Sequence, residues 1–272
     1  MKLKTLSILI GGAALAPSAL LAQFAGPQPV AFDTGTTSTD GWYTLTSAEY
    51  PGYPGFPGSG PWPSGMAPQT GASTAILDKV SNGAGGGPFP ASSGLYNGGF
   101  SGDANLNGGT LAVNESSPVT GLSTIVFQIS IGESNGYDFF DNGGDIQSPE
   151  LTISYGSSQS ITLSPDITEL MQAYNNGTFT PPEGEPQDLF INLYGYQWDV
   201  STYSNITDLS IQWTGVQHGV TYGLQLDQSS VDYGSTNMIP SVAVPEPAEW
   251  ASIVGFVTLG LVMLRRRRKS AQ

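Results

Sequence analysis

Short runs in which apolar and polar side chains alternate restrict the fold of this chain more than any other feature. The clearest run is Leu122–Ile131, where Ile125, Phe127, Ile129 and Ile131 occupy every second position. Alternation of this kind places the apolar side chains on one face of a β-strand, so the run predicts a half-buried strand. Comparable runs predict further strands at residues 41–46, 73–80, 95–100, 110–113, 151–155, 159–163, 188–198, 209–214 and 220–226.

One segment carries a helical pattern instead. Ile167, Leu170, Met171 and Tyr174 are spaced i, i+3, i+4 and i+7, and a serine, a proline and an aspartate precede them. These three residue types suit the first turn of a helix. We therefore predict one short helix, over residues 164–177, that packs on the sheet.

Proline and glycine dominate residues 50–65, where the triplet aromatic-Pro-Gly occurs three times. Because this density excludes a helix or a central strand, the segment is predicted to be a long loop. Exposed aromatic rings can stack on sugars, whereas buried ones anchor a loop to the fold. The candidates for sugar stacking are Tyr53, Phe56, Trp62 and Trp198.

These elements together predict an all-β fold. Many short strands separated by turn residues are typical of an antiparallel β-sandwich. About eight strands with long Gly/Pro-rich end loops favour the jelly-roll type. The pattern leaves the order of the strands open.

Charge excludes some classes of partner. Between residues 23 and 244 the chain has one basic residue, Lys79, against 20 acidic ones, a net charge of −19 with histidine neutral. Such a charge argues against nucleic acid and anionic membranes as partners. The chain has no cysteine, so its stability depends on its core or on a bound metal.

An acidic stretch, residues 137–145, is the best candidate for a metal site. Asp138, Asp141, Asn142 and Asp145 supply hard oxygen ligands, and two glycines permit a tight turn among them. These ligand types suit calcium, although the spacing does not match an EF-hand. The alternative is an acidic loop that is simply solvated.

Catalytic groups are scarce. His218 is the only histidine, no cysteine is present, and no Gly-x-Ser-x-Gly motif occurs. Glycoside hydrolysis needs only two carboxylates, but the near absence of Arg, Lys and His makes it a weaker alternative. We therefore expect no enzymatic activity.

The N-terminus has the features of a secretory signal peptide. Lys2 and Lys4 precede an apolar stretch, Leu6–Ala16, and Ala22 offers a small residue for cleavage, with Ala25 as a second choice. Residues 1–22 are therefore predicted to direct export across a bacterial inner membrane by the export machinery.

The C-terminal region has three parts in a fixed order. Pro245, Glu246 and Pro247 form an extended strip, because each proline restricts the backbone around it. Residues 248–264 are mostly apolar, are charged only at Glu249, and predict a transmembrane helix. Five cations follow and favour a cytoplasmic location for that end: Arg265, Arg266, Arg267, Arg268 and Lys269.

This order resembles the PEP-CTERM sorting signal. The resemblance covers about 28 residues and implies recognition of Pro245-Glu246-Pro247 by an exosortase, a membrane transpeptidase-like enzyme of Gram-negative bacteria linked to exopolysaccharide. A plain C-terminal anchor is the alternative. The expected layout is a signal peptide (1–22), a β-sandwich ectodomain (23–228), a polar linker (229–243) and a sorting tail (244–272).

We therefore expect an exported cell-surface or matrix protein with a structural or binding role in the exopolysaccharide layer. The alternatives are a carbohydrate-binding module or, less favoured, a glycoside hydrolase or lyase.

Overall fold

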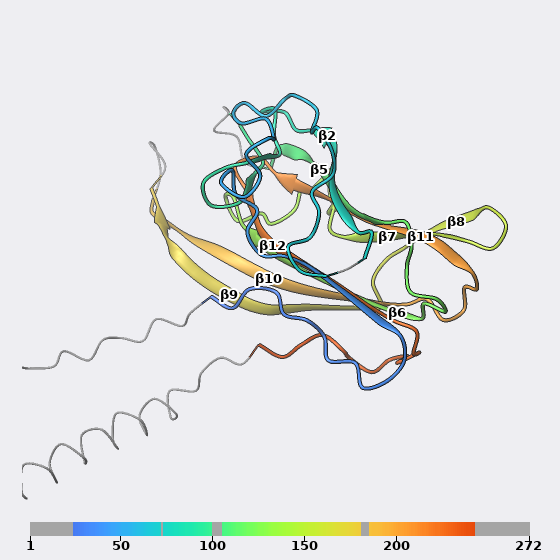
Figure 1. The fold of residues 1–272 in the computed structure, drawn as a ribbon. Helices are drawn as coiled ribbons and strands as arrows, with labels where there is room; N and C mark the ends of the chain where they lie inside the picture. The colour runs from blue at the N-terminus through green and yellow to red at the C-terminus, as the bar shows by residue number, and fades with distance from the viewer. Residues whose placement is uncertain (1–23, 72, 100–104, 181–184, 243–272) are drawn as a thin grey trace, which may run out of the picture. The chain divides into compact units, whose positions relative to one another are not determined.

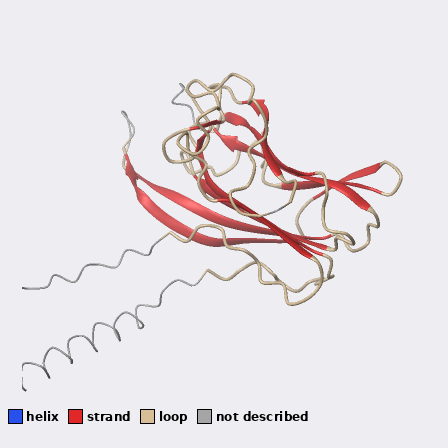
Figure 2. Cartoon of the chain, viewed as in Figure 1, coloured by secondary structure: helices blue, strands red, loops and turns tan. Residues whose placement is uncertain are grey.

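The computed structural model describes residues 24–71, 73–99, 105–180 and 185–242. Within these ranges the chain forms β-strands and no helix (Figure 2). The strands are β1 (Thr37–Trp42), β2 (Ile76–Asn82), β3 (Phe89–Pro90), β4 (Leu95–Tyr96), β5 (Asn107–Glu115), β6 (Thr124–Gly132), β7 (Glu150–Tyr155), β8 (Gln159–Leu163), β9 (Ile167–Phe179), β10 (Gln187–Asp199), β11 (Ile206–Val216) and β12 (Val220–Ser229).

The strands form two antiparallel sheets that face each other (Figure 1). The larger sheet has seven strands in the order β3-β4-β12-β6-β10-β9, and β1 pairs with β12 beside β4. The smaller sheet has five strands in the order β2-β5-β11-β7-β8. The predicted hairpin of residues 151–155 and 159–163 is present as β7 and β8. The prediction of an all-β fold with two antiparallel sheets is therefore confirmed.

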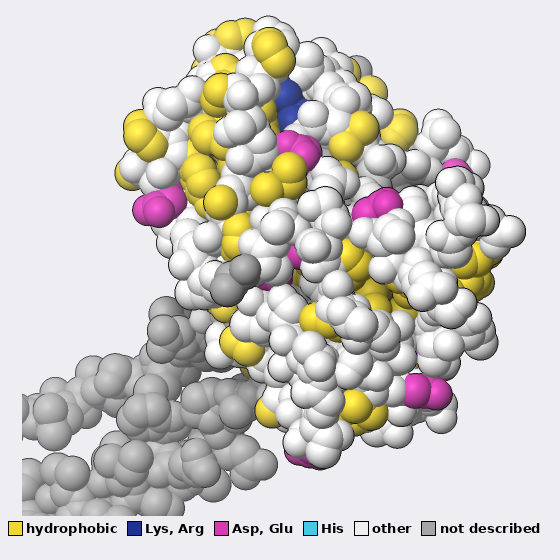
Figure 3. Space-filling model, turned by 45° about the vertical axis from the view of Figure 1, so that its right-hand side comes forward, with side chains coloured by type: hydrophobic (Ala, Val, Ile, Leu, Met, Phe, Trp, Pro, Cys, Tyr) yellow, Lys and Arg dark blue, Asp and Glu magenta, His cyan; other side chains and the backbone are white. Residues whose placement is uncertain are grey.

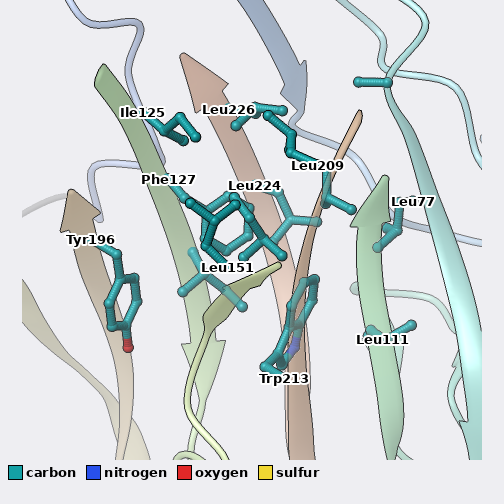
Figure 4. Packing of buried hydrophobic residues seen from close by; sticks show 14 of the residues in the cluster. Leu77, Leu111, Ile125, Phe127, Leu151, Tyr196, Leu209, Trp213, Leu224 and Leu226 are labelled. Carbon is teal, nitrogen blue, oxygen red and sulfur yellow. The ribbon is translucent and has the colours of Figure 1, made fainter. Parts of the chain in front are cut away.

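The hydrophobic core lies between the sheets (Figure 4). The apolar residues of the alternating runs point inward, so that Phe127 of β6 lies 5.6 Å from Trp213 of β11 between ring centroids. Leu224 and Leu226 of β12 are completely buried in the same layer. Full burial of each such side chain contributes roughly 1.5–3 kcal/mol, which makes this layer the main stabilising element.

The predicted helix at 164–177 is wrong, because residues 167–177 belong to strand β9. Its side chains are alternately half-buried and exposed from Ile167 to Met171, and the register against β10 then shifts between Leu170 and Gln172. A bulge of this kind changes which face the later residues occupy. Leu170, the second position of the predicted helical stripe, is 51% exposed, so the four apolar residues do not share one face, and pairing with the edge of β10 determines the structure.

The outer face of the seven-stranded sheet is covered by the segments before β1 and after β12 (Figure 1). The side-chain amide of Gln128, on β6, pairs with the backbone of Gln28. Its oxygen accepts a hydrogen bond from the Gln28 backbone N–H at 3.0 Å, and its nitrogen donates one to the Gln28 backbone carbonyl at 2.5 Å. On β10, Gln197 donates to the Thr236 carbonyl at 2.8 Å. Strand β6 is consequently buried on both faces, not on one as predicted. Residues 230–242, expected as a linker, lie against this sheet.

The predicted signal peptide and sorting tail lie outside the described residues. This concerns residues 1–22, Pro245-Glu246-Pro247, the apolar stretch 248–264 and the basic residues 265–269. Among the residues that are described, there is no helix with the length and apolar character needed to span a membrane.

Candidate functional site

The outer face of the five-stranded sheet is polar and lies open to solvent. Its side chains occupy the strand positions that alternate with the core residues, for example Thr152 between the buried Leu151 and Ile153. We call this surface the open face and define it by Asp78, Asn114, Glu150, Thr152, Thr162, Ser210 and Gln212.

A row of hydrogen bonds fixes the side chains of the open face across the strands. The Ser210 hydroxyl donates to Oδ1 of Asn114 at 2.7 Å, and Nδ2 of Asn114 donates to Oδ2 of Asp78 at 3.0 Å. The Thr152 and Thr162 hydroxyls are 2.9 Å apart. The register places Ser210 directly between Asn114 and Thr152, so both sets of hydrogen bonds belong to one row of side chains across the sheet. These polar groups are therefore held in place before any ligand binds.

A hollow of about 270 Å³ lies on this face beside a loop. Side chains of β7, β8 and β11 form one side, and residues 145–148 of the loop form the other. The loop is held to β11 because the Thr214 amide donates to the Gln147 carbonyl at 3.0 Å. The backbone N–H of Gln147 in turn donates to the Phe140 carbonyl at 2.8 Å. Backbone hydrogen bonds to the sheet thus fix the loop that forms this wall of the hollow.

The chemistry of the hollow suits a neutral ligand rich in hydroxyl groups. Its lining carries hydroxyl, amide and carboxylate groups, including Asp145, Glu150 and Gln212, and no basic side chain. Hydroxyl and amide groups exchange hydrogen bonds with sugar hydroxyls, whereas an anionic ligand would meet two carboxylates and no cation.

The acidic stretch 137–145 does not gather its carboxylates around one point. Asp138 accepts hydrogen bonds from Asn192 at 2.9 Å and from the Tyr194 hydroxyl at 2.7 Å, both on β10. Burial and this contact with Asp138 raise the pKa of Tyr194, which keeps the hydroxyl a donor.

The other predicted ligands of this stretch form a turn of their own. Asp141 accepts a hydrogen bond from the Gly144 amide at 2.5 Å, and the Asn142 amide donates to the Asp145 carbonyl at 3.0 Å. Within the ranges that the structure describes, no group of three acidic or histidine side chains is arranged to hold a metal ion. Calcium binding by Asp138, Asp141, Asn142 and Asp145 thus remains a prediction that this arrangement does not favour.

The aromatic candidates are split between the core and the loop. Trp198 is completely buried and donates its indole N–H to the Leu163 carbonyl at 3.1 Å, so the expectation that it is exposed for sugar stacking is wrong. It follows Tyr194 and Tyr196 on the inner face of β10, where the two-residue period directs all three rings inward. The alternating aromatic residues of β10 therefore indicate a core strand and not an exposed sugar-binding surface.

The rings of residues 50–65 mainly hold their own loop. Tyr53 and Trp62 are half-buried and meet edge to face at 5.4 Å, and the Trp62 indole donates to the Pro88 carbonyl at 3.2 Å. Lys79 donates to the Gly58 and Gly60 carbonyls at 2.7 and 2.6 Å. Phe56 remains 64% exposed. Figure 3 shows hydrophobic side chains gathered over the loops at this end of the molecule.

His218 lies in the turn between β11 and β12, with a positive φ of 70°. Its Nδ1 is 2.6 Å from the Tyr96 hydroxyl. Burial raises the pKa of Tyr96, which favours the neutral hydroxyl in this pair.

Sequence reasoning missed three buried carboxylates, on Asp40, Glu115 and Asp227. For two of these residues the sequence pattern contained a signal of burial. Asp40 stands two residues before the buried Trp42, and Glu115 stands two residues after the buried Val113. A carboxylate at an inward position of an alternating strand is costly unless something compensates its charge.

Comparison with protein-family models, with curated protein sequences and with solved structures finds no match to this chain.

Proposed function

We propose that this chain is an exported cell-surface or extracellular-matrix protein, sorted by an exosortase and non-enzymatic in its role. The order of Pro245-Glu246-Pro247, an apolar stretch and a basic cluster is the observation that carries this proposal. The predicted signal peptide and the absence of cysteine agree with it. The partners are then the export machinery, the exosortase and extracellular polysaccharide. The charge of the ectodomain argues against nucleic acid.

The strand order supports a jelly roll as the finer description of the sandwich. One sheet contains the series β1-β12-β6-β10, and the other contains β5-β11-β7-β8. Successive elements from β5 to β7 and from β10 to β12 cross between the sheets, as in two interlocked Greek keys. Strands β2, β3, β4 and β9 extend this plan at the edges. Lectin domains share the architecture, but function has to be argued from the site.

Intact-mass measurement of the mature protein from its native host tests sorting by cleavage. The proposal predicts that most molecules lack the basic residues 265–269, and that replacing Pro245 and Pro247 with alanine leaves uncleaved chain in the membrane fraction. Mature molecules that mostly retain this basic end would contradict processing and favour a plain anchor.

A second candidate function is carbohydrate binding at the hollow of the open face. The hydroxyl and amide lining, fixed before binding, is the observation that favours it. The test is a glycan array with the full chain in detergent, comparing wild type with Gln212→Ala and Thr162→Ala. Glycan binding that both variants lose, with Phe56→Ala as an unaffected control, would support it. Failure of the wild type to bind any glycan would contradict it.

The glycosidase or lyase alternative is tested on the same hollow, because Asp145 and Glu150 both line it. Turnover of a bound polysaccharide that disappears in Asp145→Asn and Glu150→Gln would replace binding with catalysis. Binding without turnover supports the non-enzymatic role.

A further inference from the structure

Two buried carboxylates, on Asp40 and Glu115, belong to strands of opposite sheets and lie on their core-facing sides. Asp40 of β1 is 0% exposed and Glu115 of β5 is 1% exposed. Both follow the inward alternation of their strands, which also buries Trp42 and Val113. The two acidic groups therefore stand between the sheets, at the edge of the hydrophobic core.

The same short segment holds both carboxylates. The Ser73 hydroxyl donates to Oδ2 of Asp40 at 2.7 Å, and the hydroxyl of the next residue, Thr74, donates to Oε1 of Glu115. The Ser117 amide also donates to that Glu115 oxygen, at 2.6 Å. Because consecutive residues bind the two groups, each carboxylate is fixed through one of its oxygens beside the other.

Within the ranges that the structure describes, the second oxygen of each carboxylate has no hydrogen-bond partner. These atoms are Oδ1 of Asp40 and Oε2 of Glu115, and both are buried. Oδ1 of Asp40 faces Gly71, where a Cβ would lie 2.3 Å from it. The glycine therefore allows the backbone to pass close to this oxygen, where a larger residue would clash with it.

No basic side chain compensates this pair. Lys79 is the only Lys or Arg between residues 24 and 242, and it binds carbonyls of the 50–65 loop. Burial and the nearby Glu115 raise the pKa of Asp40, which reflects the cost of placing negative charge here. Two buried carboxylates without a cation are strongly unfavourable, so the arrangement calls for a bound cation or a shared proton.

We propose that Asp40 and Glu115 form a divalent cation site between the sheets, with calcium as the ion. Two carboxylate oxygens without partners, in a setting of hydroxyl groups, match the hard oxygen ligands that calcium prefers. Water or neighbouring backbone oxygens complete the shell. The ion would link β1 of one sheet to β5 of the other and act as a staple in a chain that has no disulfide.

Thermal unfolding of the full chain in detergent tests the site, with EDTA compared against calcium chloride. At a calcium concentration about a hundredfold above Kd, binding to the folded state should raise Tm by about 5–10 °C. The isosteric double variant Asp40→Asn/Glu115→Gln should lose this shift. The matched control, Asp138→Asn/Asp141→Asn in the acidic stretch, should retain it. A shift that survives in the Asp40/Glu115 variant would overturn the proposal.

Terbium luminescence keeps the test decisive if the double variant does not fold. Tb³⁺ replaces calcium, and Trp42, two residues from Asp40, should sensitise its emission. We expect calcium to quench this emission, and Trp42→Phe to reduce it severalfold. No sensitised emission from the wild-type chain would overturn the proposal. Equal Tm values in EDTA and calcium, with a Tm that still rises on acidification in an Asp227→Asn background, would replace the cation with a shared proton.

Discussion

The two sheets share one core but differ in what lies on their outer faces. On the seven-stranded sheet, terminal segments cover the outer polar side chains, and Gln128, Gln225 and Asp227 are 0% exposed. On the five-stranded sheet, Gln212 occupies an equivalent alternating position and is exposed. The same residue type at the same kind of strand position thus becomes either a structural or a surface group. Whether such a side chain is buried depends on whether a segment outside the strands covers that face of the sheet.

The covered face should make stability depend on pH through Asp227. Burial raises the pKa of this carboxyl from 3.8 to about 7. Because the folded state binds the proton more tightly than the unfolded state, its stabilisation is complete below pH 4 and is lost as pH rises through about 7. The expected decrease in unfolding free energy between pH 5 and pH 8 is on the order of 2–3 kcal/mol.

Urea unfolding at pH 5 and pH 8, in EDTA, measures this effect. Asp227→Asn should reduce the pH dependence, whereas Asp208→Asn, at an exposed position of β11, should leave it unchanged. A wild-type chain that is more stable at pH 8 than at pH 5 would contradict the burial of a neutral Asp227.

Truncating equivalent glutamines on the two faces should give unequal losses. Gln128→Ala leaves the Gln28 amide and carbonyl without their partners, which should cost about 2–3 kcal/mol. Gln212→Ala removes an exposed side chain and should change stability by about 0.5 kcal/mol or less. Chemical denaturation of both variants measures the difference, and equal losses would mean that the terminal segment does not protect Gln128.

A smaller effect is expected where the C-terminal segment touches the sheet. A Cβ at Gly195 would lie 2.4 Å from Ile239, so Gly195→Val should cost about 1–3 kcal/mol by displacing this segment. Gly52→Val is the matched control, because nothing lies within 4 Å of its Cβ position. Both Tm values are measured by tryptophan fluorescence, and an unchanged Tm for Gly195→Val would show that residues 230–242 are not docked.

The sequence pattern predicted the inward faces well and their surroundings poorly. Alternation identified Phe127 and Ile129 as core residues, because a period of two directs side chains without reference to the rest of the fold. It could not show that Gln128 is buried, since Gln28 lies 100 positions away along the chain. For the same reason the spacing at Ile167 suggested a helix, although pairing with β10 makes a strand.

The candidate sites show the same limit. Trp198 was predicted to be exposed, yet its position in an alternating aromatic strand buries it. The open face was not predicted, because its polar residues come from strands far apart in sequence and meet only through the sheet register. The sorting tail, by contrast, is a local motif and can be recognised without the fold.

Thiol labelling tests the division between a covered and an open face most directly. The chain has no cysteine, so single Ser130→Cys and Ser210→Cys variants report one position each. Ser130 lies on the covered face of β6 and is 0% exposed, whereas Ser210 lines the hollow of the open face. Labelling at position 130 should be roughly a hundredfold slower, since it requires local opening. Similar rates at the two positions would contradict the division.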